Sequence, residues 1–131
     1  MIVYTIQMSQ WRLLLEHDIL LLNTTVKNGV KAFAPTWDIV LQVKAGIITP
    51  EEYTVVYRRL MTESFRNNRQ AWADIIKGGP VAVGCMCQYG KFCHRHLLIS
   101  YFQEICDAAK IDFEYRGEIL KGKPIPELSI V

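Results

Sequence analysis

Short, continuous runs of apolar residues alternate with segments of helical periodicity along this chain, and this alternation constrains the fold most. Residues 2–6 and 19–22 are rich in β-branched and aliphatic side chains, and residues 80–85 form a similar run directly after a glycine pair. A continuous apolar run of this length is typical of a strand that is covered on both faces. Strands that alternate with helices favour an α/β fold of Rossmann-like type, a mostly parallel sheet with helices on both faces.

The segments between these runs carry helix signals. Ser9 is the predicted N-cap of a short helix from Gln10 to about His17. Thr49, with a proline next and a glutamate three residues on, has the pattern of a capping box with proline at the first helical position. The other expected elements are a helix after Thr36 that Gly46 ends, a helical face around residues 72–76 that stops at Gly78, a helix from about 97 to 110, and a last strand at 112–115.

Length and composition indicate one domain. The chain has 131 residues, 50% of them hydrophobic, so it can bury one core but not two. We expect one α/β domain over residues 1–120 and an extended tail over residues 121–131. The net charge of +2 gives little reason to expect strong non-specific binding of nucleic acid, although local basic patches leave contacts with nucleic acid open. No basic stretch followed by a clean apolar one opens the chain, so we expect neither a signal peptide nor a membrane partner.

Cysteine and histidine residues are concentrated in the segment 85–96. Cys85, Cys87 and Cys93 lie close together, whereas a small secreted scaffold usually spreads its cysteines along the chain as disulfides. We therefore expect a reducing, cytoplasmic location. The segment should lie at the carboxyl end of a strand, where a loop feeds the next helix and where open α/β sheets place their ligands.

One interpretation of this segment is a metal centre. Cys85, Cys87, Cys93 and a histidine, either His96 or His94, would supply the sulfur and nitrogen ligands that zinc prefers. An iron–sulfur centre is the other cofactor of this type. The segment lacks the paired C-x-x-C spacing of the usual zinc motifs.

A second interpretation is a reactive thiolate beside an anion site. Free amides and the positive dipole end of a helix N-terminus lower the pKa of a nearby cysteine and attract phosphate or carboxylate. Cys93 would be the nucleophile and His94 or His96 the proton carrier, with Arg95 and Lys91 as anion contacts. The third interpretation assigns these residues to the core and to a solvated helix start, with no chemical role.

On these residues the chain resembles the family known as domain of unknown function 488 (DUF488), particularly its short bacteriophage variants. The resemblance rests on the opening segment 4–6 with Ser9, on the second strand and its loop, and above all on Cys85 followed by the triplet Cys93-His94-Arg95. It implies a compact α/β domain in which the triplet begins a helix beside the sheet. The family has no settled activity, so the resemblance implies a fold rather than a reaction.

The chain departs from the family pattern at two places. The family usually has a glutamate two residues after the strand cysteine, where this chain has Cys87, and an Asp-Val-Arg at the second strand end, where Asn23-Thr24-Thr25 stands. If those carboxylate and guanidinium groups do the family's work, this chain has an altered site. Lys27, with Lys31 and the segment 33–37 that ends at Trp37, would instead supply a basic and aromatic wall, a combination suited to a base or nucleotide. Asn23 is a further candidate ligand contact. The alternative is a surface loop whose aromatic side chains pack into the core.

The leading hypothesis is a small enzyme, or an enzyme-like binding domain, that engages an anionic small molecule such as a nucleotide or nucleic-acid component. Its reaction class stays open. One alternative is a metal-stabilised structural or regulatory module. Another is a non-enzymatic phage factor that binds a host protein through the tail, and a homo-oligomer is a further partner to consider.

Overall fold

The computed structural model, which describes residues 1–87 and 92–126, contains a four-stranded sheet with the order β2-β3-β1-β4. Every strand pair in it is parallel, which confirms the predicted α/β class. The strands are β1 (Ile2–Gln7), β2 (Leu20–Asn23), β3 (Val81–Cys85) and β4 (Glu114–Ile119). The helices are η1 (Met8–Leu14, a 3₁₀ helix), α1 (Trp37–Lys44), α2 (Pro50–Asn67), α3 (Arg69–Lys77) and α4 (His94–Ala109).

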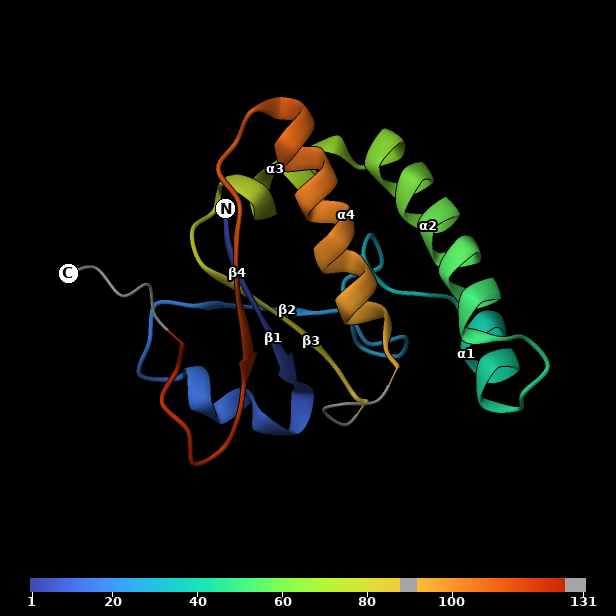
Figure 1. The fold of residues 1–131 in the computed structure, drawn as a ribbon, viewed down its shortest axis with the longest axis horizontal. Coiled ribbons are helices and arrows are strands. Elements are labelled where there is room, and N and C mark those ends of the chain that lie inside the picture. Colours follow the sequence, from blue (N-terminus) through green and yellow to red (C-terminus); the bar gives the residue numbers. More distant parts are fainter. Residues whose placement is uncertain (88–91, 127–131) are drawn as a thin grey trace.

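The connections between the strands lie on both faces of the sheet, and the face depends on the direction in which each connection crosses the order of strands. The link from β1 out to β2 contains η1, whereas the links back through β3 to β4 contain the α-helices. Figure 1 shows this arrangement, with η1 on one side of the strands and α3 and α4 on the other. It follows from the right-handed crossover that parallel strands require. The connection that leaves β1 leads toward β2, and the connection that leaves the neighbouring strand β3 leads the other way, toward β4. The carboxyl ends of β1 and β3 therefore form a topological switch point, the place where open α/β sheets bind ligands.

Alternating side chains of the strands serve the two faces. Val3 and Val83 belong to a large cluster with the α-helices, while Tyr4, Ile6 and Ala82 belong to a smaller cluster on the η1 side. The side-chain period of two in a strand produces this division. The sheet is thus covered on both faces, as the continuous apolar runs predict.

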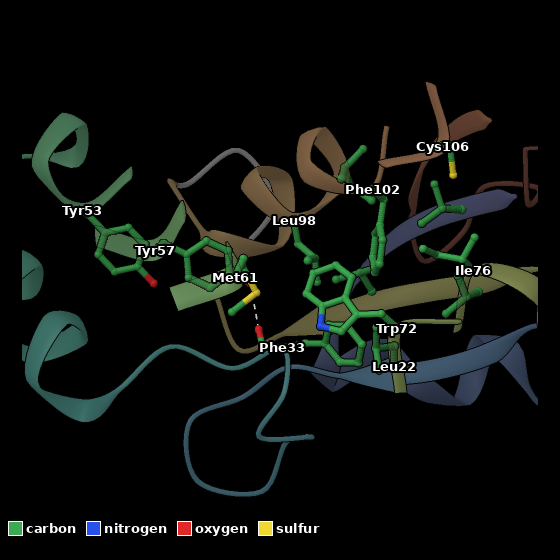
Figure 2. Packing of buried hydrophobic residues seen from close by; sticks show 14 of the residues in the cluster. Leu22, Phe33, Tyr53, Tyr57, Met61, Trp72, Ile76, Leu98, Phe102 and Cys106 are labelled. Carbon is green, nitrogen blue, oxygen red and sulfur yellow. Dashed lines mark hydrogen bonds between the residues drawn. The ribbon is translucent and has the colours of Figure 1, made fainter. Parts of the chain in front are cut away.

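Trp72 lies at the centre of the larger cluster. Its ring is fully buried, with its centroid 4.7 Å from that of Phe33 and 5.3 Å from that of Phe102 (Figure 2). The indole N–H donates to the Ser64 hydroxyl at 3.0 Å, so the one polar atom of the ring is satisfied. In the same cluster the Tyr57 hydroxyl donates to the Phe33 carbonyl at 2.7 Å (Figure 2). These contacts tie the long loop before α1 to the helices that cover the sheet.

The element boundaries agree with the sequence pattern in some places and differ in others. The capping box at Thr49 is present in full, because the Thr49 hydroxyl accepts from the Glu52 N–H and the Glu52 carboxylate accepts from the Thr49 N–H. The helix predicted to begin after Ser9 is instead a 3₁₀ helix that starts at Met8, with Gln7 at its N-cap and no side-chain cap. The N-cap residue is Gln7 rather than Ser9, and no side chain satisfies the first N–H groups, so the capping signal at Ser9 on which the prediction rested is not used.

The last strand is also longer than predicted and lies further along the chain. The sequence analysis predicts residues 112–115, whereas β4 runs from Glu114 to Ile119. Gly117 has a φ of 106° at a shift in the register between β4 and β1, and glycine accepts this conformation without strain. The strand is therefore bent at the glycine rather than ended by it.

The predicted tail after residue 120 is only partly described. Ile125 packs against the smaller core cluster on the η1 side of the sheet. Residues 127–131 lie outside the described part. Among the residues that the structure describes, no helix has both the length and the apolar character needed to cross a membrane.

Candidate functional site

The candidate site is built at the carboxyl edge of β2 and β3. Thr24, directly after β2, bonds to Gly84 near the end of β3 through both its backbone N–H (2.9 Å) and its hydroxyl (2.8 Å). The loop that follows Thr24 and the start of α4 meet at this edge. The location agrees with the sequence-based expectation for segment 85–96.

Cys85, Cys93 and His94 form a cluster that we call the sulfur–imidazole cluster. One side-chain atom from each of these buried residues lies within 4.8 Å of the others. Cys85 ends β3, Cys93 is the N-cap of α4, and His94 is the first residue of that helix. The structure joins Cys85 and Cys93 as a disulfide, with their Cα atoms 7.6 Å apart.

Thr24 fixes the protonation of the His94 ring. The His94 Nε2 atom lies 2.9 Å from both the carbonyl oxygen and the hydroxyl oxygen of Thr24. The carbonyl can only accept, and the hydroxyl gives its own proton to Gly84, so Nε2 must be the donor. Nδ1 is therefore unprotonated, and it faces the Cys93 sulfur at 3.8 Å. Burial lowers the pKa of His94 to about 4, so the ring is neutral near pH 7.

Arg95 contacts both the sulfur–imidazole cluster and β4, the edge strand on the other side of the sheet. Its side chain is fully buried, and Nη1 donates to the Cys85 sulfur at 2.9 Å and to the Cys87 carbonyl at 2.7 Å. Nη2 forms an ion pair with Glu118 of β4 at 3.1 Å. The expectation that Arg95 contacts an anionic ligand does not fit this geometry, because its guanidinium is enclosed by protein groups. Arg95 is better described as a positioning residue for the end of β3.

A pocket of about 340 Å³ opens beside the cluster, and we call it the Trp37 pocket. It is enclosed by the loop after β2, one side of α1, the start of α2 and the residues on either side of the β3–α4 loop. Its ring-bearing and charged lining residues are Trp37, Tyr53, Phe92, His94, Lys27 and Lys44. Trp37 is 53% exposed, so much of this residue is open to contact with a bound molecule. A volume of this order suits a small organic molecule.

The structure brings together only part of the site predicted from the sequence. Lys27 and Trp37 line the pocket, and Cys87 lines it without joining the sulfur–imidazole cluster. His96 is half-buried and outside both, and burial lowers its pKa, with the neighbouring Arg95 charge as a smaller cause. Asn23 serves its own loop, where its side-chain oxygen accepts from the Thr25 N–H at 2.9 Å. Lys91 lies outside the described residues.

Two residues that sequence reasoning did not select are central to the site. Thr24 holds the His94 ring, and Glu118 neutralises Arg95. Thr24 carried a detectable signal, since it follows a predicted buried strand at the edge where ligands bind. Glu118 carried none, because its pairing with Arg95 depends on how β4 aligns with a distant part of the sheet. The pocket residues Tyr53, Phe92 and Lys44 were also missed.

The fold and the site define a class: a parallel α/β domain with a buried cysteine–histidine cluster at the carboxyl edge of its sheet. The chain matches the family model DUF488-N3a, described as the active DUF488-N3 subclade, over residues 12–105. It belongs to the DUF488 family, as the residue pattern predicts, while the narrower expectation of a bacteriophage variant is not borne out. No curated protein and no solved structure matches the chain.

Proposed function

We propose that this domain binds an anionic small molecule with a planar ring, a nucleotide or nucleic-acid component, in the Trp37 pocket. The observation that carries the proposal is the composition of the pocket wall. Aromatic rings, Trp37 foremost, stand there together with the amines of Lys27 and Lys44. Base–aromatic stacking and a nearby ammonium group together suit a ring that carries a phosphate.

The position of His94 supports a chemical role for this site rather than binding alone. His94 lines the Trp37 pocket and also belongs to the sulfur–imidazole cluster. A molecule in the pocket would therefore lie next to the strongest concentration of reactive side chains in the described part of the chain. We assign the binding to the aromatic and lysine wall, and any reaction to the cluster. The enzymatic role remains part of the proposal.

A binding experiment tests the proposal directly. Nucleoside mono-, di- and triphosphates of each common base would be titrated into the protein by calorimetry. The Trp37→Ala variant is expected to bind roughly 5- to 150-fold more weakly, because one stacked base contributes about 1–3 kcal/mol. The matched control is Trp11→Ala, since Trp11 is also partly exposed but lies on η1, on the opposite face of the sheet.

A second pair of variants tests the contribution of the pocket lysines to phosphate binding. Lys27→Met removes a pocket amine, and Lys77→Met removes an amine from the end of α3, outside the pocket. Lys27→Met should weaken triphosphate binding more than binding of the uncharged nucleoside, while Lys77→Met should leave both unchanged. If no nucleotide binds, or if Trp11→Ala and Trp37→Ala weaken binding equally, the proposal is wrong.

A further inference from the structure

We infer that Cys85, Cys93 and His94 form a zinc site in which two thiolate sulfurs and the Nδ1 atom of His94 are the protein ligands. Three soft or borderline donors within 4.8 Å of one another, all buried, match the ligand types that zinc prefers. Three protein ligands leave a fourth coordination position for water or another molecule, as in catalytic zinc sites. This set replaces the sequence-based one, which used Cys87 and His96.

The hydrogen bonds of His94 prepare its ring for a metal ion. Because Thr24 accepts from Nε2, the proton is held on the side of the ring away from the sulfurs, and the Nδ1 lone pair points toward Cys93. Metal-bound histidines are usually oriented in this way, with the second ring nitrogen donating to an oxygen of the protein. Tyr57 packs against the same ring, with the centroids 5.5 Å apart, and so fixes its plane.

The charges around the cluster also fit a divalent ion. Arg95 donates to the Cys85 sulfur at 2.9 Å, which places a fixed positive charge against one of the two sulfur ligands. Glu118 balances the charge of Arg95. Two thiolates would then balance one zinc ion, so the buried group as a whole would carry no net charge. Burial of charge is least costly when the charges are paired in this manner.

The separation of the two cysteines accommodates a bridging ion. Their Cα atoms are 7.6 Å apart. Disulfides usually have Cα separations of about 4.4–6.8 Å, so the backbone holds these two cysteines wider apart than usual for a disulfide, and in the reduced protein a shared ion fits this spacing. The zinc-binding form is the reduced protein, in which a thiol reductant of the kind present in a reducing medium has converted the sulfur pair into two thiols. The ion then displaces a proton from each thiol, and both protons pass to the solvent.

The inference does not depend on what occupies the Trp37 pocket. A zinc ion would make Cys93 a metal ligand rather than the nucleophile expected from the sequence. The Trp37→Ala variant should therefore lose nucleotide affinity and keep its metal. This difference separates a failure of the proposed function from a failure of the zinc site.

The test is the metal content of protein purified under reducing conditions and supplied with zinc, measured by elemental mass spectrometry after removal of free metal. The expected result is about one zinc ion per chain. Cys85→Ser, Cys93→Ser and His94→Gln should each lose this stoichiometric zinc. The matched controls Cys87→Ser and His96→Gln should retain it.

Cobalt substitution of the unaltered protein adds a measurement that requires no variant. Apo-protein titrated with Co²⁺ should develop thiolate-to-cobalt charge-transfer bands and the visible bands of a tetrahedral ion, saturating near one equivalent. Absence of both zinc and the cobalt spectrum overturns the inference. The inference is also wrong if Cys87→Ser and His96→Gln lose zinc while His94→Gln retains it. A mass lower by two hydrogens, assigned to a Cys85–Cys93 disulfide in protein kept under reducing conditions, also overturns it.

Discussion

The buried ion pair between Arg95 and Glu118 offers the sharpest test of how the site is held together. Its side chains are 0% and 3% exposed, and the charged atoms are 3.1 Å apart. Arg58 and Glu104 form a shorter pair, at 2.7 Å, but their side chains are 44% and 57% exposed. The two pairs have the same chemistry and opposite burial, so a comparison between them isolates the effect of burial.

The substitution that tests this pair is Glu118→Gln, which keeps the shape of the side chain and removes its charge. Arg95 would then be a buried cation without a counter-charge, and its Nε atom already lacks a hydrogen-bond partner. Removing one member of a buried pair costs about 3–5 kcal/mol of unfolding free energy. The exposed control, Glu104→Gln, should cost about 1 kcal/mol or less, because solvent screens both charges.

Urea denaturation followed by circular dichroism measures both costs under the same buffer and zinc concentration. With a slope of about 1–3 kcal/mol per M for a small domain, a cost of about 3 kcal/mol lowers the midpoint by roughly 1–3 M. The double variant Arg95→Met, Glu118→Leu should recover part of the loss, since it leaves no unpaired charge. Equal midpoints for Glu118→Gln and Glu104→Gln would refute the reasoning.

Three further substitutions test the framework around the site. Thr49→Ala removes the capping box of α2 and should lower the unfolding free energy by about 1 kcal/mol in urea denaturation, whereas an unchanged midpoint would contradict the role of the cap. Tyr57→Phe leaves the buried Phe33 carbonyl without its donor and should cost about 1–3 kcal/mol by the same assay; a neutral effect would mean that another donor replaces the hydroxyl. Gly29→Ala places a methyl group against the Thr25 carbonyl oxygen, so the loop must shift. Calorimetry should then show weaker nucleotide binding, and unchanged affinity would show that this loop does not shape the pocket.

Much of the fold was predictable because its signals are local. The capping box of α2 and the apolar run of β3 each involve a few neighbouring residues, and both elements were found where the pattern placed them. The predictions were wrong where a local signal was not used or where a distant partner decides. Ser9 does not cap the helix after β1, which is a 3₁₀ helix with Gln7 at its N-cap, and β4 extends past Gly117 because its partner β1 continues alongside.

The candidate site was predictable in its location but not in its membership. The spacing of cysteines and histidines pointed to segment 85–96, and a strand followed by a helix placed it at the carboxyl edge of the sheet. Spacing alone could not choose between His94 and His96. That choice depends on Thr24, which lies 70 residues away along the chain and bonds to His94 alone of the two.

The sequence by itself determined the α/β class, the family and the chemical types of the residues at the site, because periodicity and residue identity are properties of neighbouring positions. Tertiary structure alone decided which side chains meet. It buried Arg95 against Glu118, turned His94 toward the sulfurs and left Trp37 facing an open pocket. These outcomes depend on the register and stacking of segments that are far apart in the chain. The free energy of each contact exists only once those segments have packed together.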